Sequence, residues 1–124
     1  PEFDFPYELT EYEQRCAGDH LSLNAFVDEK PAGFKVGYDR FKDGSFYSWM
    51  GGVLPQFRRQ GIAYTLADEQ EGWARERGYT VIRLKTWKKH QAMLEFCIQR
   101  GFAIIEEIPK TPEPESRIWL EIQL

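Results

Sequence analysis

The stretch from Ser45 to Gly78 constrains this chain more than any other, because it joins a strand pattern to a helix pattern through a basic turn. Residues 46–54 are rich in aromatic and β-branched side chains, which predicts a strand, and Pro55 ends it because proline cannot donate to a sheet ladder. After the turn, apolar side chains recur at helical spacing, and Gly78 supplies a stop after the last turn. The predicted apolar face consists of Ile62, Ala63, Leu66, Ala67, Trp73 and Ala74.

The turn between these two elements suits an anion. A helix N-terminus presents unpaired backbone N–H groups and the positive end of the helix dipole. Gly61 lets a ligand approach the backbone, Ala63 keeps the next exposed position small, and Arg58 and Arg59 add positive charge. The run lacks the Gly-Lys-Ser/Thr ending of a Walker phosphate loop. Taken alone, it fits an anion site for a pyrophosphate and an ordinary connection with two solvated arginines about equally well.

Two motifs in the same order resemble the GNAT superfamily, the acyl-CoA-dependent N-acetyltransferases. Val53-Leu54-Pro55 followed by Arg58-x-x-Gly61-x-Ala63 is similar to the acetyl-CoA-binding motif of that family, V-x-P followed by (Q/R)-x-x-G-x-(G/A). Residues 90–102, HQAMLEFCIQRGF, look like its second conserved helix, N-x-x-(A/M)-(I/L)-x-(L/F)-Y-x-x-x-G-F. The resemblance covers roughly residues 21–124.

Periodicity along the chain predicts a mixed α/β (α+β) sheet with helices packed on it, in one domain over residues 1–124. The resemblance implies a GNAT-like fold, with two central strands splayed apart around the acyl-CoA and helices on both faces. Compared with the family pattern, the N-terminal strand and first helix are short or missing. Strands are expected at residues 21–27, 34–41, 46–54, 80–86, 102–108 and 117–123. Helices are expected at residues 7–18, from residue 62 to a stop at Gly78, and at residues 91–100. Turns are expected at residues 28–33 and 42–45, and a loop at residues 111–116.

Composition narrows the classes of protein. A chain of 124 residues with 42% hydrophobic content is long enough for one modest core. The formal net charge of -4 argues against a general nucleic-acid binder. No apolar run approaches the ~20 residues needed to span a bilayer, and no signal-peptide pattern opens the chain. Cys16, Cys97, His20 and His90 have no metal-ligand spacing, so we expect two reduced thiols, no metal and a cytoplasmic protein.

The resemblance implies that the chain transfers an acetyl group from acetyl-CoA to an amine by direct attack in a ternary complex. In the family, the segment matching Val53 and Leu54 pairs with the pantetheine amides, and a backbone N–H there would face the developing oxyanion. The turn amides hold the CoA pyrophosphate. The cofactor-binding residues implied are Val53, Leu54, Arg58, Arg59, Gln60, Gly61, Ile62, Ala63, Tyr64 and His90.

The chain departs from the family at the reactive positions, which leaves three catalytic candidates. Cys97 stands where a tyrosine commonly serves as the acid, so its thiol either protonates the leaving thiolate or is a small buried residue. His90 replaces an asparagine, and it either transfers protons near neutral pH or caps its helix or faces solvent. Tyr47 falls near the usual glutamate base, and it either orients a water or packs in the interior.

A second function class remains open at this stage. The missing tyrosine and glutamate favour a catalytically degenerate GNAT domain that binds acyl-CoA as a sensor or interaction module. Release of free thiol in the presence of an amine distinguishes the enzyme from that module. The acceptor is expected to be a small-molecule or peptide amine, with no nucleic acid or membrane involved, and a homodimer stays open.

Overall fold

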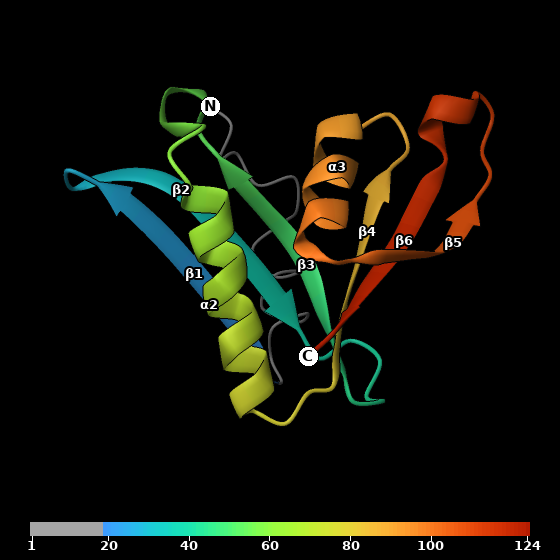
Figure 1. Ribbon diagram of the computed structural model, residues 1–124, viewed down its shortest axis with the longest axis horizontal. Helices are drawn as coiled ribbons and strands as arrows, with labels where there is room; N and C mark the ends of the chain where they lie inside the picture. The colour runs from blue at the N-terminus through green and yellow to red at the C-terminus, as the bar shows by residue number, and fades with distance from the viewer. Residues whose placement is uncertain (1–18) are drawn as a thin grey trace, which may run out of the picture.

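The computed structural model describes residues 19–124, which form a six-stranded mixed sheet with two α-helices (Figure 1). The strand order is β1-β2-β3-β4-β6-β5; β3 and β4 run parallel, and the other neighbours are antiparallel. The helix predicted over residues 7–18 lies outside the described residues. The elements are β1 (His20–Val27), β2 (Lys30–Tyr38), β3 (Ser45–Val53), the 3₁₀ turn η1 (Pro55–Phe57), α2 (Ile62–Glu76), β4 (Val81–Trp87), α3 (Gln91–Arg100), β5 (Ala103–Ile108), the 3₁₀ turn η2 (Glu113–Glu115) and β6 (Arg117–Gln123).

The sequence patterns located these elements well, with one clear error at the first hairpin. α3 and β6 have the predicted bounds, and the other strands shift by one to four residues at an end. The expected turn over residues 28–33 is wrong, because only Asp28 and Glu29 form it, with φ angles of 50° and 68°. Two consecutive residues at positive φ make a tight hairpin turn. Pro31 therefore falls inside β2, at a register shift between Ala25 and Phe26 of β1.

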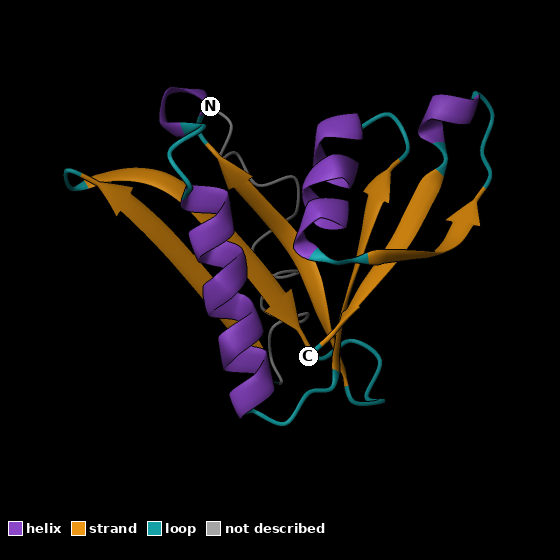
Figure 2. Cartoon of the chain, in the orientation of Figure 1, coloured by secondary structure: helices purple, strands orange, loops and turns teal. Residues whose placement is uncertain are grey.

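Both described helices cover the same face of the sheet (Figure 2). The core on this face centres on Phe46 of β3, whose ring lies 5.1 Å from that of Trp73 on α2 and 5.2 Å from that of Tyr79. α3 adds the fully buried Cys97 to the same cluster. The resemblance implied helices on both faces, but any helix on the second face would have to come from outside the described residues. No helix among residues 19–124 is long and apolar enough to cross a membrane.

The two central strands are splayed apart, as the resemblance implied. β3 and β4 pair only from Ser45–Tyr47 to Val81–Arg83. Beyond that point β3 stays paired with β2 as far as Val53, while β4 stays paired with β6 as far as Trp87. The sheet therefore opens into a V between its two halves (Figure 1).

Candidate functional site

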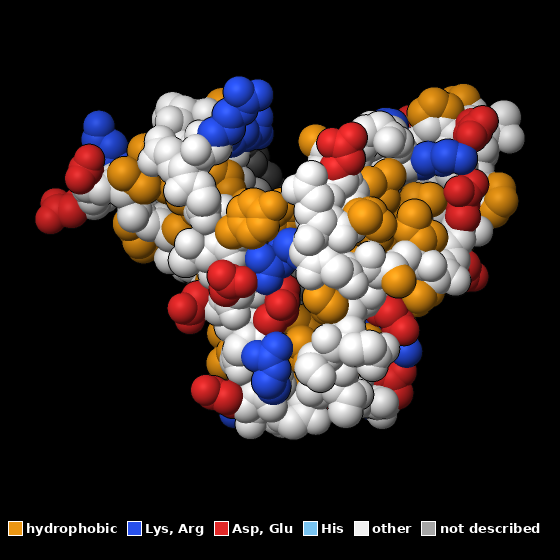
Figure 3. Space-filling model, in the orientation of Figure 1, with side chains coloured by type: hydrophobic (Ala, Val, Ile, Leu, Met, Phe, Trp, Pro, Cys, Tyr) orange, Lys and Arg blue, Asp and Glu red, His pale blue; other side chains and the backbone are white. Residues whose placement is uncertain are grey.

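A cavity of about 650 Å³ lies where β3 and β4 separate. The space-filling view shows the molecule notched between its two halves, with Lys and Arg side chains on one rim (Figure 3). β2 and β3 form one wall, β4 and α3 the other, and the start of α2 contributes Ala63 and Leu66. Among the described residues that line it there are four basic or titratable side chains and no carboxylate. Those four are Lys35, Arg58, Lys85 and His90.

The mouth of the cavity meets the N-terminus of α2. The helix starts after Gly61, which has a φ of 79°, and its first hydrogen bond runs from the Thr65 N–H to the Gly61 carbonyl at 3.0 Å. Within residues 19–124, the backbone N–H groups of residues 62–64 therefore have no hydrogen-bond acceptor. No acidic side chain occupies the first turn to neutralise the dipole. This geometry fits an anion bound against the turn.

The side chains in and beside the turn differ in what they contact, and not all of them reach the cavity. Arg58 donates from Nε to the Val53 carbonyl at 3.1 Å, which places its guanidinium at the edge of the cavity. Arg59 is exposed, with a φ of 64°, and Gln60 donates from Nε2 to the Gln56 carbonyl at 3.5 Å. Tyr64 does not line the cavity: its hydroxyl donates to Gln99 Oε1 at 3.3 Å, which ties α2 to α3.

The backbone of β3 corrects one detail of the expected cofactor contacts. The Leu54 N–H already donates to the Ala32 carbonyl at 2.8 Å, so it is unavailable to a ligand or an oxyanion. Hydrogen-bonded and non-bonded pairs alternate along an antiparallel ladder. Val53 and Gly51, which face Gly33 and Lys35 on β2, therefore direct their backbone groups away from β2, towards the open side. The available donors on this strand are those of Val53 and Gly51.

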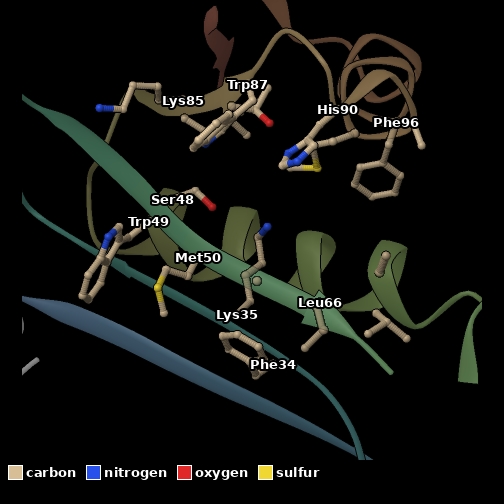
Figure 4. A pocket seen from close by; sticks show the side chains of 18 of the residues that line it. Phe34, Lys35, Ser48, Trp49, Met50, Leu66, Lys85, Trp87, His90 and Phe96 are labelled. Atoms are coloured by element: carbon tan, nitrogen blue, oxygen red, sulfur yellow. The ribbon is translucent and has the colours of Figure 1, made fainter. Parts of the chain in front are cut away.

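His90 lies on the cavity wall, as the sequence interpretation required. It is exposed and precedes α3 without capping the helix through its side chain. Its imidazole stacks on the Trp87 ring at 6.0 Å between centroids, and both rings line the cavity (Figure 4). His90 is therefore placed to touch a bound ligand.

Cys97 lies in the core and does not line the main cavity. Its exposed fraction is 1%, and burial raises the pKa of its thiol to about 11. A thiol that holds its proton more tightly than usual is a poor donor to a thiolate leaving group. We therefore revise the interpretation of Cys97 as the acid and assign it a packing role.

Tyr47 also lies away from the cavity. Side chains alternate along a strand, so Tyr47 faces away from α2 and α3 whereas Phe46 faces them. The Tyr47 ring packs in an aromatic group, 5.6 Å from Tyr38 and 5.9 Å from Trp119, and the Arg40 guanidinium lies 4.8 Å from its centroid. In this structure Tyr47 is a packed residue of the second face.

Sequence reasoning missed Lys35, whose amine points from β2 into the cavity (Figure 4). The alternation in FKVGY places the bulky residues of β2 on one face and suggests a solvent-facing lysine on the other. The other face is instead covered by α2, since Gly33, two residues before Lys35, approaches Ile62. The sequence signal that could have singled out Lys35 is its position as a lone charged residue between Gly33 and Gly37 of the same strand.

The comparisons with known proteins agree with this architecture. The fold is similar to the ribosomal-protein-S18-alanine N-acetyltransferase of Escherichia coli, with a TM-score of 0.80 and 18% identity over 98% of this chain and 79% of that one. It is also similar to Ard1 from Thermoplasma volcanium, with a TM-score of 0.81 and 17% identity over 99% and 84% of the two chains. An aminoglycoside 6'-N-acetyltransferase complexed with coenzyme A gives a TM-score of 0.78 and 16% identity over 91% and 77%.

Identities this low show a shared fold and no more. A search of curated proteins gave no match. Residues 1–102, however, match the sequence model described as "Acetyltransferase (GNAT) family", and this match extends across most of the chain. The chain therefore belongs to the GNAT acetyltransferase family.

Proposed function

We propose that this protein transfers an acetyl group from acetyl-CoA directly to an amine within a ternary complex. The observation that carries the proposal is the continuity of the site: the free N–H groups at the start of α2 open onto a cavity that runs between the splayed strands. An extended ligand with an anionic group at one end matches both parts. Family membership and the acetyltransferase neighbours support the same reaction class.

Different groups of the chain bind different parts of acetyl-CoA. The N–H groups of residues 62–64 bind the diphosphate, and Arg58 adds positive charge at the cavity edge. Val53 and Gly51 offer backbone groups to the amides of the pantetheine arm, much as an added strand would. Bound acetyl-CoA supplies the activated acetyl group. Trp87 and Met93, with the other apolar wall residues, exclude water from the reacting end.

The acceptor is an amine whose identity the fold leaves open. The names of two structural neighbours point to acceptors as different as an alanine of a ribosomal protein and an aminoglycoside. Function in this class depends on the site more than on the fold. An acceptor panel should therefore include peptide N-termini, lysine side chains and aminoglycosides.

The test combines a binding titration with a chemical readout. The full chain is titrated with acetyl-CoA by calorimetry, and free thiol is then followed across the acceptor panel. We expect binding, with thiol released above the rate of spontaneous hydrolysis for at least one amine class. Saturable binding without thiol release on any amine would instead identify an acyl-CoA-binding module, and absence of binding would refute the site altogether.

A further inference from the structure

Lys35 reaches the cavity because the neighbouring strand leaves room for it. Its partner across the β2–β3 ladder is Gly51, and a Cβ atom added there would lie 3.5 Å from Lys35 Cγ. The aliphatic part of the Lys35 side chain thus passes over Gly51, which has no side chain. Its side chain lines the main cavity and also a smaller hollow of about 10 Å³, which Ser48 and Cys97 line too. The Lys35 side chain therefore extends from beside Gly51 inward to the hollow at Ser48, one residue past the last β3–β4 pair, and its amine points into the cavity (Figure 4).

The amine has no partner that fixes its charge. No hydrogen bond or ion pair within residues 19–124 holds it. Glu71 on α2 is the acid that interacts with it electrostatically, but Glu71 is paired with Arg100 of α3 at 2.7 Å. Desolvation is the main cause that lowers the pKa of Lys35, and Arg100 lowers it further, while Cys97 and Glu71 act in the opposite direction. The residues that β3 and β4 contribute to the smaller hollow, Ser48 and Leu84, carry no charge.

We propose that Lys35 is the proton donor to the leaving thiolate in this enzyme, a role that rests on the proposed acetyl transfer. The anion site fixes one end of the ligand at the start of α2, so the acyl end lies inward along β3. From Val53 to Ser48 that strand extends about 16 Å at 3.3 Å per residue. Of the four basic or titratable side chains that line the cavity, Lys35 is the one that also reaches the smaller hollow. Arg58 lies at the mouth, His90 stacks on Trp87 at the end of β4, and Lys85 Nζ lies 5.3 Å from the centre of the Trp119 ring. Cys97 lies in the core.

The proposed step balances in protons and electrons. The acceptor nitrogen forms the new C–N bond as the C–S bond breaks, and the bonding pair stays on sulfur. The Lys35 ammonium gives its proton to that sulfur and becomes a neutral amine. The acceptor ammonium loses two protons in all; one goes to solvent and the other, through solvent, restores Lys35. An ammonium with a lowered pKa is better matched to a thiolate than an ordinary lysine is.

The first test measures the thiol of bound CoA, without turnover. The ultraviolet absorbance of the thiolate is followed against pH in complexes of coenzyme A with the wild type and with Lys35→Met. A positive charge beside the sulfur stabilises the thiolate, so in the wild type it should form at a pH lower by about 1 or more. Lys30→Met, an exposed lysine at the start of the same strand, should behave as the wild type. Equal titrations in wild type and Lys35→Met, with CoA bound to both, would overturn the proposal and leave the proposed function standing. Failure of CoA to bind the wild type would refute the proposed function instead.

The second test separates proton transfer from charge. Lys35→Arg keeps the positive charge but holds its proton too tightly to donate it. We expect Lys35→Met and Lys35→Arg both to lose turnover on the order of 100-fold, with the KM for acetyl-CoA nearly unchanged. Wild-type kcat should fall as the pH rises through the lowered pKa of Lys35, and Lys35→Met should lack that decline. Full activity in Lys35→Arg, or an unchanged pH profile in Lys35→Met, would contradict the proton-donor role.

Discussion

The two ends of the β3–β4 pair differ in strand pairing, in burial and in side-chain packing. At the closed end, where Ser45–Tyr47 pairs with Val81–Arg83, Phe46 is fully buried and ring contacts fill both faces of the sheet. At the open end the same strand exposes Gly51 beside a cavity of about 650 Å³. One sheet thus provides both a packed core and a cavity, because the pairing that holds its two halves together stops where the cavity begins.

The largest effect is expected at the closed end, for Gly37→Ala. A Cβ atom at Gly37 would lie 2.7 Å from the Tyr47 carbonyl oxygen and 2.9 Å from Phe46 Cζ, and closer still to Phe46 Cε2. Overpacking of this kind costs about 1–3 kcal/mol, and contacts this close place Gly37→Ala at the upper end of that range. Chemical denaturation of the variant should show this loss in the free energy of unfolding.

The matched change at the open end is Gly51→Ala, where the nearest atom is the Phe34 carbonyl oxygen at 3.2 Å. Its cost in stability should be clearly smaller, because every contact of the added Cβ is 3.2 Å or longer. Equal losses for Gly37→Ala and Gly51→Ala would mean that the two ends do not differ in packing as described.

The next effect concerns the turn at the cavity mouth. Gly61→Val introduces a β-branched residue at a φ of 79°, although no atom lies within 4 Å of the added Cβ. The backbone must shift to relieve this strain, which misaligns the N–H groups at the start of α2. We expect CoA affinity to fall at least about tenfold, or 1.4 kcal/mol, measured by calorimetry.

Gly78→Val is the control for that change, since Gly78 lies past the other end of α2 with a φ of 90° and equally open surroundings. It should cost similar stability and leave CoA affinity unaltered. If the two variants weakened CoA binding equally, the loss at Gly61 would reflect general destabilisation, not a local cradle.

A smaller effect is expected for Cys97→Ala, because this thiol is packed in the core. Removing the sulfur should cost about 1 kcal/mol of unfolding free energy through the cavity that it leaves. The kcat should stay at the wild-type value, because we assign proton donation elsewhere. If turnover fell by more than the amount of folded protein does, Cys97 would have a catalytic role.

The smallest effect should come from Gln70→Met. Gln70 is 2% exposed and its Nε2 has no hydrogen-bond partner within the described residues. A buried unpaired amide destabilises a fold, so an apolar residue of similar volume should leave stability unchanged or raise it by about 1 kcal/mol. A thermal melt of both proteins measures the difference. A clear drop in melting temperature would show that the amide is satisfied in solution, for example by water in the small hollow beside it.

The sequence alone determined the local elements and the glycine turn that precedes α2. The strand before Pro55, the helix after Gly61 and the helix from Gln91 to Arg100 follow from periodicity and from the backbone preferences of glycine and proline, which act over a few residues. The GNAT resemblance and the splayed sheet likewise rest on short motifs.

Only the tertiary structure decided which reactive side chains meet the cavity. Cys97 and Tyr47 stand at positions that looked catalytic, yet the fold buries one in the core and turns the other to the second face. Lys35 was assigned no role from the sequence, and it meets the cavity because α2 covers that side of β2. Local propensity fixes where a strand or helix forms, whereas burial depends on which distant element packs against it.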